Sequence, residues 1–122
     1  MGESSNGEAQ RSIEELIASF AEHEPPFSSL GMPFLVDTEA TDALVRMGDA
    51  AVPSLEAALE DDDPKITMYS AYCLGLIGNP SVLPALGRTL ARYEAREPKQ
   101  SQDYAVIGAV NRAEERLGAA GP

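Results

Sequence analysis

The chain contains an internal repeat of about thirty residues. The segment "ALVRMGDAAVPSLEAAL" at 43–59 aligns with "CLGLIGNPSVLPALGRTL" at 73–90. The equivalent pairs are Leu44 and Leu74, Gly48 and Gly78, Val52 and Val82, then, after one inserted residue, Pro53 and Pro84, Leu55 and Leu86, and Leu59 and Leu90. This period is typical of arrays of helical hairpins, in which no single unit can bury its own apolar face.

Proline, glycine and acidic residues divide the chain into a series of helices. A helix beginning at Ser12 is expected to stop at Pro25-Pro26, and Gly48 and Gly78 suit the left-handed position after a helix end. Apolar residues at helical spacing predict further helices over about 38–47, 52–59, 64–77, 80–95 and 102–117. No segment shows strand alternation. The sequence therefore predicts an all-α fold, an α-α superhelix that forms a short α-solenoid of antiparallel helix pairs.

The repeat suggests one domain with short tails. We expect flexible tails at 1–11 and 119–122 around a single helical-repeat domain at 12–118, with repeats at about 36–61 and 63–97 and a partial third repeat at 102–118. The 24–37 connection carries three prolines among apolar residues and is expected to fold back over one end of the core. The third repeat has no second helix after Leu117, so the open end predicts a monomer or weak self-association.

Charge limits the partners that such a chain can bind. The formal net charge is −11, which disfavours contact with nucleic-acid phosphates. From Glu22 to Asp63 there are eleven acids and one base, whereas from Arg88 to Arg116 there are six bases and five acids. The acidic half either receives a basic partner or forms a solvated face that keeps the protein soluble. With a single cysteine, no membrane-length apolar run and no signal peptide, a cytoplasmic location without membrane binding is expected.

The residues of the second repeat resemble a known family. The HEAT repeat, in the short bacterial form called PBS-lyase HEAT-like, reads approximately Asp-Pro-x-Val-Arg-x-x-Ala-Ala-x-Ala-Leu-Gly-x-Ile-Gly. The corresponding residues here are Asp63, Pro64, Ile66, Ser70, Ala71, Cys73, Leu74, Gly75, Ile77 and Gly78. The similarity covers Val36 to Leu90. One departure is Thr67, which stands where the family frequently has an arginine that links neighbouring repeats.

The resemblance implies a range of functions. Such arrays are mostly protein-binding scaffolds whose second helices line a concave face, a minority are phycobilin lyases or their relatives, and a further group excises bases from DNA. We therefore expect a non-enzymatic scaffold or adaptor that binds a protein partner through its second-helix face and needs no cofactor. A phycobilin-lyase-like chromophore handler is the alternative. The net charge of −11 disfavours the base-excising role.

No catalytic or metal-binding constellation stands out in the sequence. His23 is the only histidine, so a histidine triad or a multi-histidine metal site is excluded. Cys73 takes a small apolar place in the repeat and should be buried and inert. The "EDDD" run at 60–63 lacks the alternation of a calcium loop, and a turn with an N-cap at Asp63 explains it. Gly75 is expected to allow close helix packing.

The candidate partner-binding residues are charged stripes on the two second helices. Arg88, Arg92 and Arg96 are four residues apart on one helix, and the first repeat carries an acidic stripe on the corresponding helix. These stripes either pair with each other across the face or dock a partner. The complete predicted set is Arg88, Arg92, Arg96, Glu56, Glu60 and the neighbouring Tyr93.

Overall fold

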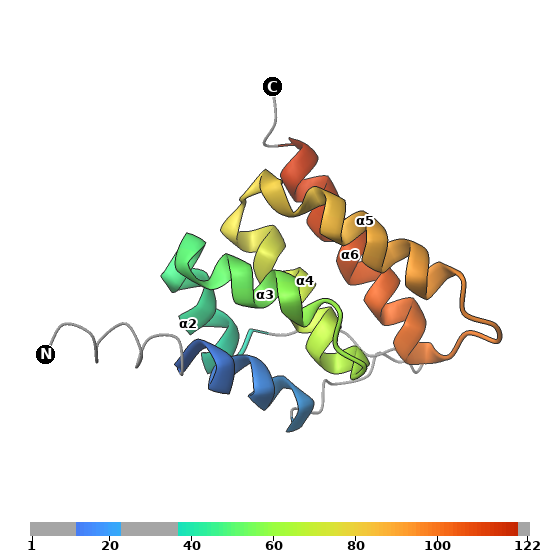
Figure 1. The fold of residues 1–122 in the computed structure, drawn as a ribbon, viewed down its shortest axis with the longest axis horizontal. Helices are drawn as coiled ribbons and strands as arrows, with labels where there is room; N and C mark the ends of the chain where they lie inside the picture. The colour runs from blue at the N-terminus through green and yellow to red at the C-terminus, as the bar shows by residue number, and fades with distance from the viewer. Residues whose placement is uncertain (1–11, 23–36, 120–122) are drawn as a thin grey trace, which may run out of the picture.

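The computed structural model describes residues 12–22 and 37–119, and these residues form helices and turns without a strand (Figure 1). The first helix covers residues 12–19 and continues as the 3-10 turn η1 (Phe20–Glu22). The further elements are α2 (Glu39–Met47), η2 (Gly48–Ala51), α3 (Val52–Ala58), α4 (Pro64–Ile77), η3 (Pro80–Val82), α5 (Leu83–Glu94) and α6 (Ser101–Ala119). The predicted all-α repeat fold is confirmed.

Residues local in the chain define the helix ends. Thr38 caps α2 in a capping box with Thr41, in which each side chain accepts a hydrogen bond from the other residue's backbone N–H. Asp63 caps α4 and Pro64 starts it, as expected, and Gly78 ends it with φ 86° and ψ 23°, in the left-handed region. Gly48 also has a positive φ, 61°, but its ψ of −132° lies outside the expected left-handed helical region, because the chain enters the 3-10 turn η2 at this residue.

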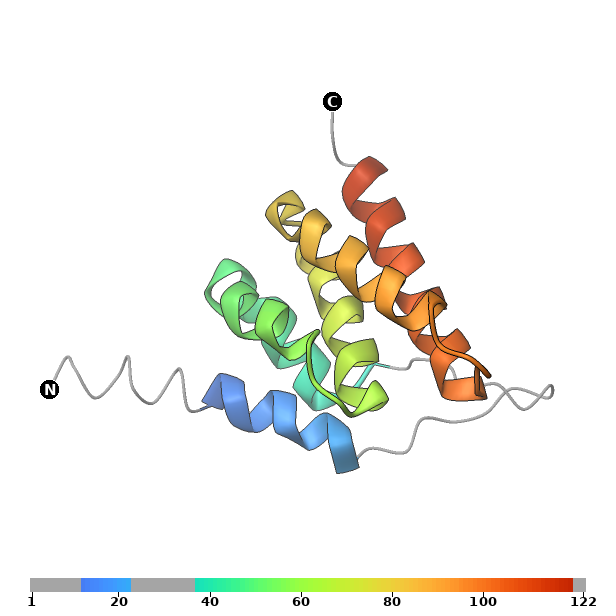
Figure 2. The ribbon, with the colours of Figure 1, turned by 45° about the vertical axis from the view of Figure 1, so that its right-hand side comes forward.

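The helices stack in chain order in two layers (Figure 2). The first helices of successive repeats, α2, α4 and α6, pack against one another with α4 in the centre. The other layer holds the first helix of the chain, α3 and α5; α3 packs on α4, and α5 packs on α6. The chain thus contributes one second helix before the first full repeat and one first helix after the second.

One continuous core lies between these layers. Leu44 and Leu74, equivalent residues of the two repeats, are both buried as expected, with exposed fractions of 0% and 1%. Phe20 stacks on Tyr69 with ring centroids 5.0 Å apart, which joins the first helix to α4. Gly75 is also confirmed as a close-packing residue, since a Cβ at this position would lie 2.9 Å from the Cα of Ala113 in α6.

Some predicted segments lie outside the described residues. These are the 1–11 tail, residues 120–122, the 24–36 part of the connection, the Pro25-Pro26 stop and His23. α6 ends at Ala119, the first residue of the expected 119–122 tail.

Candidate partner-binding face

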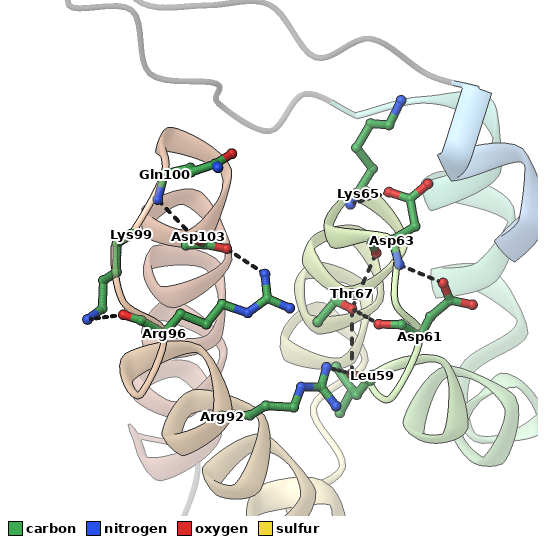
Figure 3. A network of polar contacts seen from close by, with 10 residues as sticks. All are labelled: Leu59, Asp61, Asp63, Lys65, Thr67, Arg92, Arg96, Lys99, Gln100 and Asp103. Atoms are coloured by element: carbon green, nitrogen blue, oxygen red, sulfur yellow. Dashed lines mark hydrogen bonds and ion pairs between the residues drawn. The ribbon is translucent and has the colours of Figure 1, made fainter.

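Arg92 joins the second helices of the two repeats. From α5 its guanidinium donates one hydrogen bond to the backbone carbonyl of Leu59 at 2.8 Å (Figure 3). It donates a second one to Glu60 Oε2 at 3.0 Å. Leu59 is the C-cap of α3, where carbonyl groups lack intrahelical partners and the helix dipole favours a cation. Arg92 therefore caps α3 and fixes it beside α5.

Thr67 adds a second donor at the same turn. Its hydroxyl lies 3.2 Å from the carbonyl oxygen of Asp61, 3.4 Å from that of Asp63 and 3.5 Å from that of Leu59 (Figure 3). The short side chain of Thr67 thus bonds the turn that precedes its own helix. Arg92 binds the same Leu59 carbonyl from α5, at the shorter distance of 2.8 Å.

Arg96 is bound to the turn between α5 and α6. Its guanidinium lies 2.7 Å from Asp103 Oδ1, and the other oxygen of Asp103 accepts the backbone N–H of Gln100 at 2.9 Å. Asp103 is only 5% exposed, and Lys99 donates to the carbonyl of Arg96 at 3.2 Å. This polar cluster fastens the start of α6 to the end of α5 (Figure 3).

Tyr93 lies in the core beneath the two arginines. Its exposed fraction is 0%, and the guanidinium carbons of Arg96 and Arg92 lie 4.1 and 5.3 Å from the centroid of its ring. The two cations therefore cover one aromatic ring. Tyr93 was predicted as a surface contact for a partner; its burial makes it a support for the arginines instead.

The predicted charged residues thus fall into two groups, those bound to other residues of the fold and those without an ion pair among the described residues. Arg92, Arg96 and Glu60 are engaged within the fold. Arg88 is exposed and Glu56 is half-buried, and within residues 12–22 and 37–119 neither makes an ion pair. The mutual pairing considered for the stripes occurs between Glu60 and Arg92. Asp103 and the Leu59 carbonyl were missed; the acid in the first turn of α6 was a signal for the former, but no sequence pattern marks a carbonyl acceptor.

A groove lies between the first helix and α3. It has a volume of about 380 Å³, and its lining includes Ile17 and Ala18 from the first helix, Ala57 from α3 and Ile66 from α4. Glu14 and Asp61 also line it. No sequence pattern marks this groove, because the packing of residues 12–19 against α3 has no local signature.

The remaining polar candidates are structural. Asp61 accepts the backbone N–H of Asp63 at 2.8 Å, and Asp63 accepts that of Lys65 at 2.9 Å, which confirms the turn and N-cap in the acidic run. In the described part of the chain, no three potential ligand residues gather in a metal-binding group. Cys73 is buried, and this burial, with smaller contributions from Asp37 and Asp42, raises the pKa of its thiol to about 12. The thiol is thus held in its unreactive protonated form.

Two further contacts join the repeats. Asn79 donates to Asp49 Oδ1 at 3.2 Å, so residues at equivalent places in the two repeats bond directly. The hydroxyl of Tyr72 donates to Asp37, just before α2. The pKa of Tyr72 is raised to about 12. Burial is the largest cause, and the hydrogen bond to Asp37 and the charge of Asp37 add to it. These contacts and Arg92 hold the two repeats in register.

Comparison with known families supports the repeat architecture. The family model described as HEAT repeats matches residues 32–101, more than half of the chain. This protein belongs to the HEAT repeat family. HEAT repeats generally act as scaffolds for protein–protein interaction and are typically non-enzymatic. No curated protein and no solved structure matched the chain.

In this HEAT repeat protein, Thr67 and Arg92 reach the same backbone carbonyl, that of Leu59. Thr67 stands where the family frequently has an arginine, and its short hydroxyl also reaches the carbonyl of Asp61 in the turn between the repeats. Arg92 supplies a guanidinium to the neighbouring repeat from α5 instead.

None of the helices in 12–22 and 37–119 combines the length and hydropathy that crossing a lipid bilayer requires.

Proposed function

We propose that this protein is a non-enzymatic interaction module that binds a protein partner through its second-helix face. The structural observation that carries this proposal is the clamp at Arg92, which joins α3 and α5 into one surface. A preformed surface binds with a smaller loss of conformational entropy than two helices that move independently. Membership of the HEAT repeat family favours the same role.

Arg88 and Glu56 are the charged contacts that this surface offers a partner. Arg88 is exposed on α5 and Glu56 is half-buried on α3, and neither is part of the clamp or of the Asp103 cluster. An arginine contributes directional contacts to carboxylates at protein interfaces. Arg92 and Arg96 stabilise this surface and do not contact the partner, because their guanidinium groups bind other residues of the fold.

Affinity capture with matched charge-swap variants tests the proposal. The face variant carries Arg88→Glu and Glu56→Lys, which leaves the net charge unchanged and avoids the arginines that hold the fold. The control variant carries Arg112→Glu and Glu115→Lys, two exposed residues of α6 in the other layer. Capture by the wild-type protein and the control, with loss of the same partner from the face variant, is the expected result. A partner set that the face variant retains in full contradicts the proposal.

A further inference from the structure

The groove between the first helix and α3 has an apolar floor and low walls. Ile17 and Ile66 line it and are each 8% exposed, so their side chains form its base. The exposed residues Ala18 and Ala57 line it from the two helices. Because alanine projects a single methyl group, these walls leave the groove of about 380 Å³ open to solvent.

The first helix, and α3 together with the turn that follows it, carry acids and no base. Residues 12–22 contain three acids and no base, and residues 52–63 contain five acids and no base. Of these, Glu14 and Asp61 line the groove itself, one from each side, and both are exposed. The groove therefore combines an apolar base with carboxylates at its edges.

Lysine and arginine side chains match this combination. Their aliphatic stems cover apolar surface while the charged head remains at the edge in water. A stem lying over Ile17 and Ile66 would bring its head to Glu14 or Asp61, which line the same groove. The acidic surroundings also increase the rate at which a cationic segment arrives.

We propose that the groove between residues 12–19 and α3 binds a lysine- or arginine-rich segment of a partner protein. Binding at this groove presupposes the partner-binding role proposed above and names the chemistry of the partner. It adds the first helix to the binding surface. The acidic residues near this groove would then attract the partner as well as keep the protein soluble.

Titration with a defined peptide tests this site. The probe is a fluorescein-labelled peptide of about 12 residues, enough for about three helical turns, with lysines and leucines at helical spacing. Its counterparts carry glutamine or glutamate in place of lysine. Fluorescence anisotropy with the full chain is expected to show saturable binding of the lysine peptide and at least tenfold weaker binding of both counterparts. Equal binding of the glutamine peptide contradicts a cation-specific groove.

Charge-neutralising variants separate the groove from general acidity. Glu14→Gln and Asp61→Asn are each expected to raise the Kd of the lysine peptide about two- to fivefold. Asp61→Asn keeps the side-chain oxygen that accepts the N–H of Asp63. The controls Glu115→Gln and Asp42→Asn change the same charges at exposed places on α6 and α2 and should change the Kd by less than about 1.5-fold. Equal losses in groove and control variants would show diffuse electrostatic attraction and overturn the proposal.

A steric variant tests the apolar base independently of charge. Ala57→Trp places a large ring in the groove and is expected to weaken the lysine peptide at least about fivefold. Ala91→Trp is the matched control at an exposed position of α5. Unchanged or tighter binding by Ala57→Trp, with a thermal unfolding midpoint like that of the control, overturns the proposal. If the Arg88 face variant loses its captured partner while the peptide fails to bind, only the groove is wrong, and the scaffold function stands.

Discussion

The two repeats of this protein have similar sequences but different surroundings. In α4 nine of the 14 residues are buried, whereas in α2 only Thr41 and Leu44 of nine residues are. The difference arises because α4 packs between α2 and α6 in its layer. Among equivalent leucines, Leu59 is 0% exposed but Leu90 is only half-buried. Position in the array thus determines how much an equivalent residue contributes to stability.

The largest difference in the free energy of unfolding is expected between alanine variants of these two leucines. Leu59→Ala should lower the free energy of unfolding by about 2–5 kcal/mol, because it leaves a cavity in a fully buried site. Leu90→Ala should cost about 1 kcal/mol, since its half-buried side chain loses fewer contacts. Urea unfolding followed by circular dichroism measures both. Equal losses would contradict the dependence on position in the array.

A second comparison concerns two glycines inside helices of the second repeat. Gly75→Ala is expected to cost about 1–3 kcal/mol, because the new Cβ would lie 2.9 Å from the Cα of Ala113 and push α4 from α6. At Gly87 a Cβ meets nothing within 4 Å, so Gly87→Ala should stabilise by about 0.5–1 kcal/mol through helix propensity. The same unfolding measurement distinguishes them, and stabilisation by Gly75→Ala would contradict the close approach.

The glycines that end the first helices should tolerate asparagine differently. Gly78 has φ 86° and ψ 23°, near the left-handed region that asparagine adopts, so Gly78→Asn should cost less than about 1 kcal/mol. Gly48, with φ 61° and ψ −132°, is close to a region almost limited to glycine, and Gly48→Asn should cost about 1–3 kcal/mol. Thermal unfolding of the two variants measures the difference. The reverse order would show that the two repeats share one turn geometry.

Substitutions of Arg92 and Arg88 should differ in their effect on the free energy of unfolding. Arg92→Met is expected to lower the free energy of unfolding by about 1–2 kcal/mol through loss of the Leu59 and Glu60 contacts. Arg88→Met, at an exposed position on the same helix, should change it by less than about 0.5 kcal/mol. Chemical unfolding of both variants provides the test. Similar losses of unfolding free energy for the two variants would show that the Arg92 contacts do not stabilise the packing of the two repeats.

The smallest expected effect is a pH dependence at Tyr72. Because its pKa is raised from 10.0 to about 12, the folded state favours the protonated phenol. Its contribution is present below pH 10 and is lost as the pH rises toward 12. The stability difference between the wild type and Tyr72→Phe should therefore narrow across this interval in urea unfolding series. A constant difference would indicate that the Asp37 contact does not stabilise the protonated form.

Helix limits were the most predictable part of this protein. The bounds of α4, from Pro64 to Ile77, matched the expectation, because Asp63, Pro64 and Gly78 act on the backbone next to them. The conformation of Gly48 was less predictable, since it depends on the 3-10 turn that follows. For the site, Arg88 and Arg92 were correctly placed on one helix, but α5 ends at Glu94, so the prediction that Arg96 continues the stripe on this helix was wrong. The different partners of Arg92 and Arg96 were not foreseen.

The sequence by itself determined the repeat, its helices and the family, because caps, helix stops and apolar spacing act over a few residues. Only the tertiary structure decided that Arg92 caps α3, that Tyr93 is buried and that a groove forms beside residues 12–19. These features depend on distances between helices that are remote in the chain. A side chain's choice between solvent and a neighbouring carbonyl is settled by packing, which no local pattern records.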